Sequence, residues 1–190
     1  MARTAAFDRT VVARAARELF WDRGFDAVSL PELERACGLN RSSIYNSFGS
    51  KRGLYDAAVR DYRENVVGPL LARLSGSSAD PSALAEYLNA IARAVGGAPG
   101  ADRGCLLLNS AAGLAAHDEV QRHVVDDYRR ELHDAVYAAL GSALPALSDG
   151  DRSVRARLLV AAVLAAMLLA RINSEEAERT VADARALLLR

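Results

Sequence analysis

A run of polar side chains between residues 40 and 46 carries groups that are suited to contacting DNA. Its members are Asn40, Arg41, Ser42, Ser43, Tyr45 and Asn46. An arginine fork pairs with guanine, an asparagine amide pairs with adenine, and serine is small enough to let a helix approach the bases. We therefore expect Arg41 to contact base edges, and we expect Tyr45 and the nearby Lys51 to contact phosphate oxygens.

A short helix is predicted to lead into this run. Ser29 and Glu32 have the spacing of a capping box, in which each side chain binds a free backbone group at a helix start. A helix over residues 30–37 follows. Gly38 is suited to the positive φ angle that ends such a helix and turns the chain.

A second short helix is predicted over residues 41–48, after the cap that Asn40 supplies. Ile44 and Phe48 lie four residues apart and form its buried side. The first residues of such a helix reach base edges in the major groove, and Lys51 lies at the start of the next helix. A polar octamer alone is more typical of a solvated helix face. Here the capping box, the glycine corner and Lys51 occur together at the spacing of two short helices and the start of a third, so the segment predicts a helix-turn-helix.

The remainder of the sequence predicts an all-α protein. Of its 190 residues 51% are hydrophobic, and no alternating strand pattern extends beyond a few residues. The net charge is zero but unevenly distributed: residues 1–63 hold 11 basic and 8 acidic side chains, whereas residues 64–190 hold 13 and 16. A cationic N-terminal part is suited to a protein that meets phosphates with one end.

The sequence shows no residue pattern that is typical of metal binding, catalysis or membrane insertion. The three histidines do not share a helical face at metal-ligand spacing, and no catalytic triad or phosphate-binding glycine loop stands out. The longest uncharged apolar run, 158–170, has 13 residues, whereas a membrane span needs about 20. Two cysteines and no apolar signal segment favour a reducing cytoplasm. We expect no enzyme activity, no metal or other cofactor, no membrane partner and a cytoplasmic location.

Two domains of about nine helices in all are predicted. The expected helices cover residues 8–23, 30–37, 41–48, 51–69, 81–95, 105–116, 118–140, 151–172 and 174–189. Residues 1–53 form a three-helix domain with the helix-turn-helix, and residues 54–190 form a helical body. Pro69 is expected to end or bend one helix and Gly141 to stop another, in which Val120 and Tyr128 face inward.

The last two helices are expected to join two copies of the chain. Val163 and Ala166 lie in a run with no polar face. The final helix has an apolar stripe formed by Ala177, Val181, Ala184 and Leu188. A helix that is apolar all round must be covered on all sides, which four helices from two chains provide. The alternative is a self-contained monomer core. A dimer with heads about 34–36 Å apart would read a near-palindromic operator.

An ordered set of residues resembles the N-terminal pattern of the TetR family of transcriptional regulators. The set consists of Ala16, Phe20, Gly24, Phe25, Ser29, Gly38, Tyr45, Phe48, Ser50, Lys51 and Leu54. The segment GCLLLN at 104–109 and the closing pair of helices are also similar in kind. The resemblance is strongest at residues 10–62 and extends over essentially the whole chain.

The resemblance implies a dimeric regulator, usually a repressor, whose body binds a small molecule that releases it from DNA. The expected DNA contacts are Ser29, Asn40, Arg41, Ser42, Ser43, Tyr45, Asn46 and Lys51. The expected ligand contacts in the body domain are Tyr62, Val66, Leu88, Cys105, Leu108, Asn109, Tyr128 and Met167. The apolar character of the second set favours a lipophilic effector.

Two departures from the family pattern support an alternative. Asn46 and Ser47 replace aromatic or histidine residues that are frequent there, and Glu34 stands where a small residue is usual. The alternative is a helical small-molecule sensor, or a cysteine-based redox or electrophile sensor, with degenerate DNA binding. Cys105 is expected at a helix start, where a thiolate is stabilised, although an inert buried thiol is the simpler interpretation.

Overall fold

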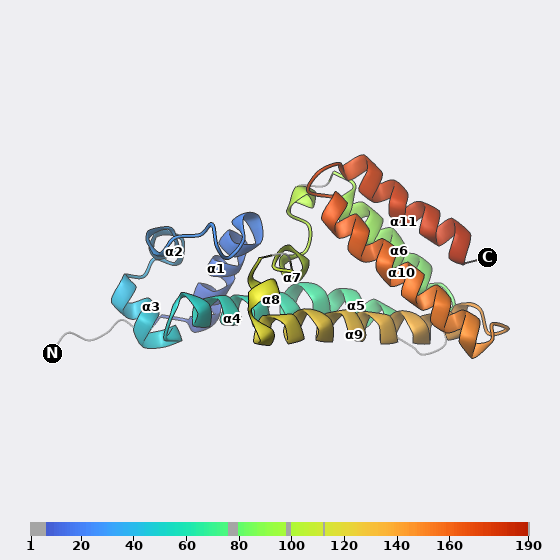
Figure 1. The fold of residues 1–190 in the computed structure, drawn as a ribbon, viewed down its shortest axis with the longest axis horizontal. Coiled ribbons are helices and arrows are strands. Elements are labelled where there is room, and N and C mark those ends of the chain that lie inside the picture. Colours follow the sequence, from blue (N-terminus) through green and yellow to red (C-terminus); the bar gives the residue numbers. More distant parts are fainter. Residues whose placement is uncertain (1–6, 76–79, 98–99, 112, 190) are drawn as a thin grey trace. The chain divides into compact units, whose positions relative to one another are not determined.

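All regular structure in the described part of the chain is helical. The computed structural model describes residues 7–75, 80–97, 100–111 and 113–189; within them nine α-helices have eight residues or more and two have four. Figure 1 shows these helices along the chain. The predicted all-α class is confirmed. None of the described helices combines the length and the apolar character that a membrane span requires.

Four helices form the N-terminal part, namely α1 (Arg9–Arg23), α2 (Leu30–Cys37), α3 (Arg41–Phe48) and α4 (Lys51–Tyr62). The bounds of α2 and α3 are those that the sequence predicts. Both predicted caps are formed, since the capping box opens α2 and the Asn40 side chain accepts from Ser43 N–H at 2.9 Å. Gly38 ends α2 with a φ angle of 64°, as expected for a glycine corner.

Side chains from all four of these helices meet in one core. Phe20, Leu33, Ile44 and Leu54 come from α1, α2, α3 and α4 in turn, and each is 0% exposed. Tyr55 lies edge-on to Phe20, with ring centres 5.1 Å apart. Each short helix therefore has an apolar anchor that decides which of its faces remains outside.

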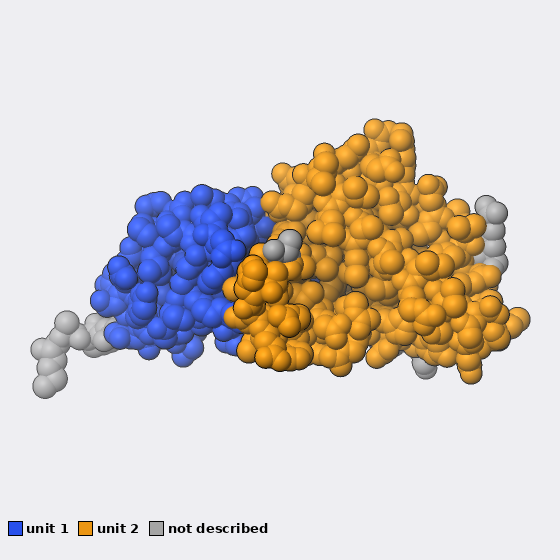
Figure 2. Space-filling view, viewed as in Figure 1, with its two compact units in different colours: residues 1–67 blue, residues 68–190 orange. Residues whose placement is uncertain are grey.

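The chain divides into two compact units after Val67 (Figure 2). We call residues 1–67 the head and residues 68–190 the body. The sequence predicts a boundary at residue 53, but α4 packs along α1, so that its apolar face, including Ala58, belongs to the head core. The chain therefore leaves the head only after α4 and the turn that follows it.

A π-helical turn, Arg63–Val67, separates α4 from α5 (Gly68–Ser75). The expected interruption occurs, but it lies before Pro69, which is in the first turn of α5. Proline has no N–H to offer the carbonyl of Asn65 four residues earlier, and the wider spacing of a π turn accommodates this gap. The Asn65 side-chain amide donates to the Asp61 carbonyl oxygen at 3.1 Å and to the Asp61 carboxylate at 3.0 Å.

The body consists of helices packed around an apolar core. After α5 come α6 (Ala83–Val95), the short turn η2 (Ala101–Arg103), α7 (Leu106–Asn109), α8 (Leu114–His117), α9 (Glu119–Ala143), α10 (Asp149–Leu169) and α11 (Ser174–Leu188). Helix α10 packs against α9 and α11, and α11 also packs against α6. Leu84, Leu132 and Leu159 are each 0% exposed in this core.

Three expectations for the body are wrong. The single helix predicted over 105–116 is two four-residue helices, because Gly113 has a non-helical backbone (φ −101°, ψ −103°). Helix α9 continues through Gly141, which is not a stop: a Cβ there would lie 3.1 Å from the Arg152 side chain, so glycine leaves room for that side chain. Val120 is 65% exposed, since the inward position in the first turn of α9 is taken by Gln121, which is 1% exposed.

The apolar stripe predicted on the last helix is largely covered within its own chain. Ala177 is 0% exposed and Val181 is 1% exposed, because α11 packs against both α6 and α10. A different row of side chains stays uncovered on α10 and just beyond it. That row contains Val154, Leu158, Ala161, Ala165, Leu168 and Ile172.

Candidate nucleic-acid interface

Helix α3 presents one polar face outward. Ile44 anchors the opposite face, and Arg41, Ser42, Tyr45 and Asn46 are exposed and together line one surface hollow. The structure therefore brings together four of the predicted DNA contacts on one turn-and-a-half of helix. Ser43 is half-buried, and its N–H is used by the Asn40 cap.

Arg41 and Tyr45 form a pair on this face. The Arg41 guanidinium carbon lies over the Tyr45 ring at 5.5 Å from its centre, and the tyrosine is 40% exposed. A cation at this distance is attracted by the negative face of the ring. The two predicted contacts therefore interact with each other as well as facing outward.

Lys51, the first residue of α4, also lies over an aromatic ring. Its ammonium nitrogen is 4.4 Å from the centre of the Phe25 ring. Partial burial lowers the pKa of Lys51, whereas the nearby carboxylates of Asp26 and Glu32 raise it. The lysine is thus held close to the protein surface instead of extending freely into solvent.

Ser29 takes part in the capping box of α2. The Glu32 carboxylate accepts from the Ser29 hydroxyl at 2.6 Å and from the Ser29 N–H at 2.8 Å, and it pairs with Arg23. These bonds, those from Ser29 first, lower the pKa of Glu32 from 4.5 to about 2. The hydroxyl proton of Ser29 is therefore engaged within the head.

Arg9 is a residue of this region that the sequence reasoning missed. It is the first residue of α1, and its guanidinium lies over the Phe48 ring at 4.9 Å from the ring centre. Phe48 is the last residue of α3, so this contact places a cation beside the far end of that helix. The pairing joins segments 39 positions apart in the chain, and no local pattern announces it.

The residues predicted to contact a ligand are mostly enclosed by protein. In the head, Tyr62 is 4% exposed and lies edge-on to Trp21, and Val66 is half-buried in the π turn. In the body, those with exposed fractions between 1% and 9% are Leu88, Cys105, Leu108, Tyr128 and Met167. Ordinary core packing accounts for these burial values.

Asn109 has a structural task in the body. Its amide donates to the Arg103 carbonyl oxygen at 2.8 Å, and Arg171 donates to the same oxygen at 3.0 Å. Gly104, the residue after Arg103, has a φ angle of 60°. A Cβ at this position would lie 2.4 Å from the Met167 carbonyl oxygen. The conspicuous GC pair at 104–105 is therefore explained by a tight turn.

Three polar groups lie together in the body core. Tyr128 is 6% exposed, and its side chain is hydrogen-bonded to that of Cys105. Burial, followed by Cys105 and Tyr87, raises the pKa of Tyr128 well above its usual value. Tyr87, which the sequence reasoning missed, is 2% exposed, and burial likewise raises the pKa of its hydroxyl.

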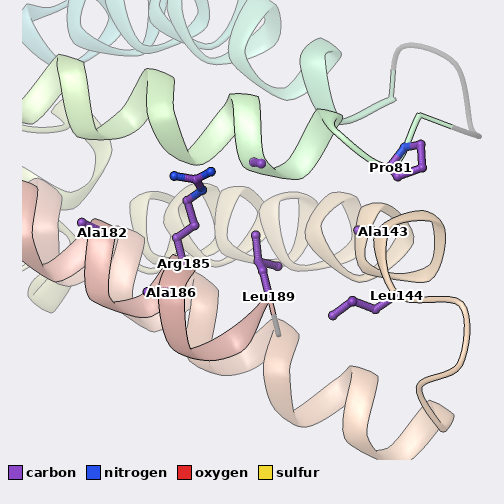
Figure 3. A pocket seen from close by; sticks show the side chains of 8 residues that line it. Pro81, Ala143, Leu144, Ala182, Arg185, Ala186 and Leu189 are labelled. Carbon is purple, nitrogen blue, oxygen red and sulfur yellow. The ribbon is translucent and has the colours of Figure 1, made fainter.

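The described residues of the body form, among others, the following two concave places. A cavity of about 320 Å³ is lined largely by apolar side chains of α7 to α10, among them Leu108, Ala115, Val125 and Leu164. A groove of about 350 Å³ lies among α6, α9 and α11, where Arg185 extends from α11 toward α6 (Figure 3). Of the predicted ligand contacts, Leu108 lines the first cavity.

A helix-turn-helix with an outward recognition surface, carried on a helical body, defines a DNA-binding transcriptional regulator. Residues 13–58 match the model for bacterial regulatory proteins of the tetR family. Residues 13–58 therefore form a DNA-binding domain of the TetR family, and the relatives that match over more of the chain are transcriptional regulators.

Similar proteins extend beyond the head. The HTH-type transcriptional regulator YezE of Bacillus subtilis is 27% identical over 179 residues, which is 92% of each chain. The HTH-type transcriptional repressor BdcR of Escherichia coli is 32% identical over 65% of this chain and 60% of its own. The fold is similar to that of the TetR family regulator CifR, solved with a 26-base-pair operator DNA (TM-score 0.80, 24% identity, 97% of this chain and 99% of that one).

Proposed function

We propose that this chain is a homodimeric repressor that binds a near-palindromic operator and that a small lipophilic effector releases it from DNA. The observation that carries the proposal is the outward face of α3, with Arg41, Ser42, Tyr45 and Asn46 all exposed on an anchored helix. The operator complex of CifR and the repressor BdcR support DNA binding and repression, respectively.

The roles of the α3 residues follow from their chemistry. Arg41 is at the first position of the helix, where side chains reach base edges, and its fork suits guanine. Ser42 and Asn46 have small polar side chains, which permit α3 to approach the bases closely. Lys51 supplies charge for a phosphate at the next helix start. Asn40 and Ser29 act mainly as the caps that hold α3 and α2 in this geometry.

The uncovered row on α10 supports dimerisation. Leu158 and Leu168 are 51% and 48% exposed, and Ile172 is 83% exposed. The row recurs at alternating spacings of four and three residues, the pattern of helices that pack side by side. We propose that the α10 and α11 helices of two chains form a four-helix interface, and that Leu158→Asp produces a monomer in sedimentation experiments.

The effector is proposed to act through the segment that leaves the head. Binding in the 320 Å³ hollow of the body, whose lining is largely apolar but includes Arg122, Asp126 and Arg129, would favour one of two orientations of α4 and the π turn. Tyr62, Val66 and Pro69 lie on this segment. A shift in the spacing of the two heads would then weaken the operator match.

Salt-dependent gel shifts test the DNA-binding part of this proposal. The full chain is mixed with its own upstream region and with random DNA at several salt concentrations. Specific binding with a steep salt dependence supports the regulator, because cations that meet phosphates release counterions. The absence of specific binding at every salt concentration favours the sensor with a degenerate head.

The cysteine-based alternative has less support from the structure. Cys105 is 2% exposed, and α7 has only four residues, too short to stabilise a thiolate through a helix dipole. We expect a thiol reagent to modify Cys105 much more slowly in the native chain than in urea. Equally fast labelling, accompanied by loss of DNA binding, would restore the alternative.

A further inference from the structure

The Arg41 side chain has one feature that a plain surface arginine lacks. Its guanidinium lies over the Tyr45 ring, one helical turn further along α3. Within the described residues it has no ion pair, so the ring is the contact that restricts it. Both side chains border the hollow that Ser42 and Asn46 complete.

Restriction before binding matters for a long side chain that must meet a base edge in one orientation. A free arginine loses rotamer freedom when its planar fork docks, and this loss opposes recognition. An aromatic ring that already holds the guanidinium reduces the loss, as preorganisation does in other interfaces. The ring face performs this task, and a tyrosine hydroxyl is not required for it.

Two neighbouring pairs in the head support this distinction. Arg9 lies over Phe48, and Lys51 lies over Phe25, at 4.9 and 4.4 Å from the ring centres. In both pairs the ring is a phenylalanine, so a cation in this part of the protein lies over an aromatic face that has no hydroxyl.

We infer that Tyr45 is a positioning residue for Arg41: its ring orients the arginine that reads a base, in addition to any phosphate contact of its hydroxyl. The inference rests on the proposed function of α3. It predicts that selectivity at one base position depends on an aromatic ring at residue 45. The hydroxyl would instead affect all sequences alike.

The test uses the full chain and a duplex selected from random DNA by the unaltered protein. Affinities are measured for that duplex and for every single-base variant, with Tyr45→Phe, Tyr45→Leu, Arg41→Ala and the Tyr45→Leu/Arg41→Ala double variant. Asn46→Ala is the matched control, because it alters the next residue of the same exposed face. Thermal unfolding and the salt dependence are recorded for each, to exclude loss of the fold.

Three results are expected. Tyr45→Phe keeps the discrimination at the position read by Arg41, whereas Tyr45→Leu reduces it about two- to fivefold, the size of an exposed cation–π contact. In the Arg41→Ala background, Tyr45→Leu reduces the discrimination no further. Asn46→Ala leaves this position unchanged and affects another.

Other results overturn the inference in distinguishable ways. Equal losses for Tyr45→Phe and Tyr45→Leu, spread over all sequences, would mean that the hydroxyl is a phosphate contact and the ring positions nothing. Additive losses in the double variant would also reject it, since the two side chains would then act independently. If the unaltered protein selects no sequence, the proposed function of α3 fails, and the positioning role fails with it.

Discussion

The ion pairs inside the head differ from those inside the body. In the head, Arg17 of α1 donates to Asp61 of α4 at 2.5 Å, and the two side chains are 11% and 4% exposed. On α9 of the body, Asp126 pairs with Arg129 and Arg130 of the same helix, and these side chains are about half exposed. The Arg17–Asp61 pair thus joins two helices of the head, whereas the Asp126 pairs lie within one helix of the body.

This difference suits the two proposed tasks. A buried, directional pair permits few arrangements of the helices it joins, as a surface that must match a DNA groove requires. Contacts among leucine, alanine and valine side chains are not directional, so a core made largely of them restricts the arrangement of its helices less strongly. We infer that the head is built for one geometry and the body for adaptation to a ligand.

The largest effect is expected from breaking the buried pair. Asp61→Ala leaves Arg17 without its main interhelical partner and should lower the free energy of unfolding by about 3 kcal/mol. Trp21, the only tryptophan, lies in α1 and makes its fluorescence a probe of the head during urea unfolding. The control Asp126→Ala removes an exposed pair and should change the free energy of unfolding far less, because solvent screens such pairs. Equal losses for the two variants would remove the contrast between the units.

The next largest loss of stability is expected where the backbone of α4 passes close to the end of α3. A Cβ at Gly53 would lie 1.8 Å from the Phe48 carbonyl oxygen, at the junction of α3 and α4. Because neither backbone can yield easily, Gly53→Ala should destabilise the head by about 2 kcal/mol in the same unfolding experiment. Gly150→Ala, where the nearest atom is 3.8 Å away, is the matched control and should be nearly neutral.

The capping box should give a smaller effect that depends on pH. The folded pKa of Glu32 is about 2, below its ordinary 4.5, so its charge stabilises the head above pH 4.5. This contribution is lost as the pH falls from 4.5 through 2. The stability difference between the unaltered protein and Glu32→Gln should therefore shrink over that range. A difference that stays constant with pH would show that the charge is not involved.

The smallest effect is expected at the end of α3. Arg9→Gln removes the cation held over Phe48. If Arg9 meets a phosphate, operator binding weakens for all sequences, and the slope of log affinity against log salt decreases by about 0.9. Arg35→Gln, an exposed arginine near the end of α2, provides the comparison. An unchanged slope for Arg9→Gln would assign the pair to packing alone.

The sequence predicts the head more closely than the body, for a physical reason. The bounds of α2 and α3 depend on caps and a glycine corner, which are signals between residues a few positions apart. Gly141 shows the opposite case: its neighbour is the Arg152 side chain of another helix, so the sequence pattern wrongly indicates a stop. Ala177 and Val181 likewise form a predictable stripe, but the helices that cover it are decided by tertiary packing.

The candidate site divides in the same way. The outward set on α3 could be predicted because anchor and exposed positions alternate within one short helix. The Arg9–Phe48 pair could not, since it joins distant segments. In the body, apolar residues are predicted to be inside, yet periodicity does not tell a core residue from one that lines a cavity. Leu108 is such a residue.

Footprinting on the selected duplex shows whether two chains bind one operator. We expect two protected half-sites centred about 34–36 Å apart on one face of the duplex, occupied by two chains, with Arg41→Ala relaxing the same base position in each by roughly 1–3 kcal/mol. A single protected site bound by one chain, or undiminished discrimination by Arg41→Ala, would contradict it.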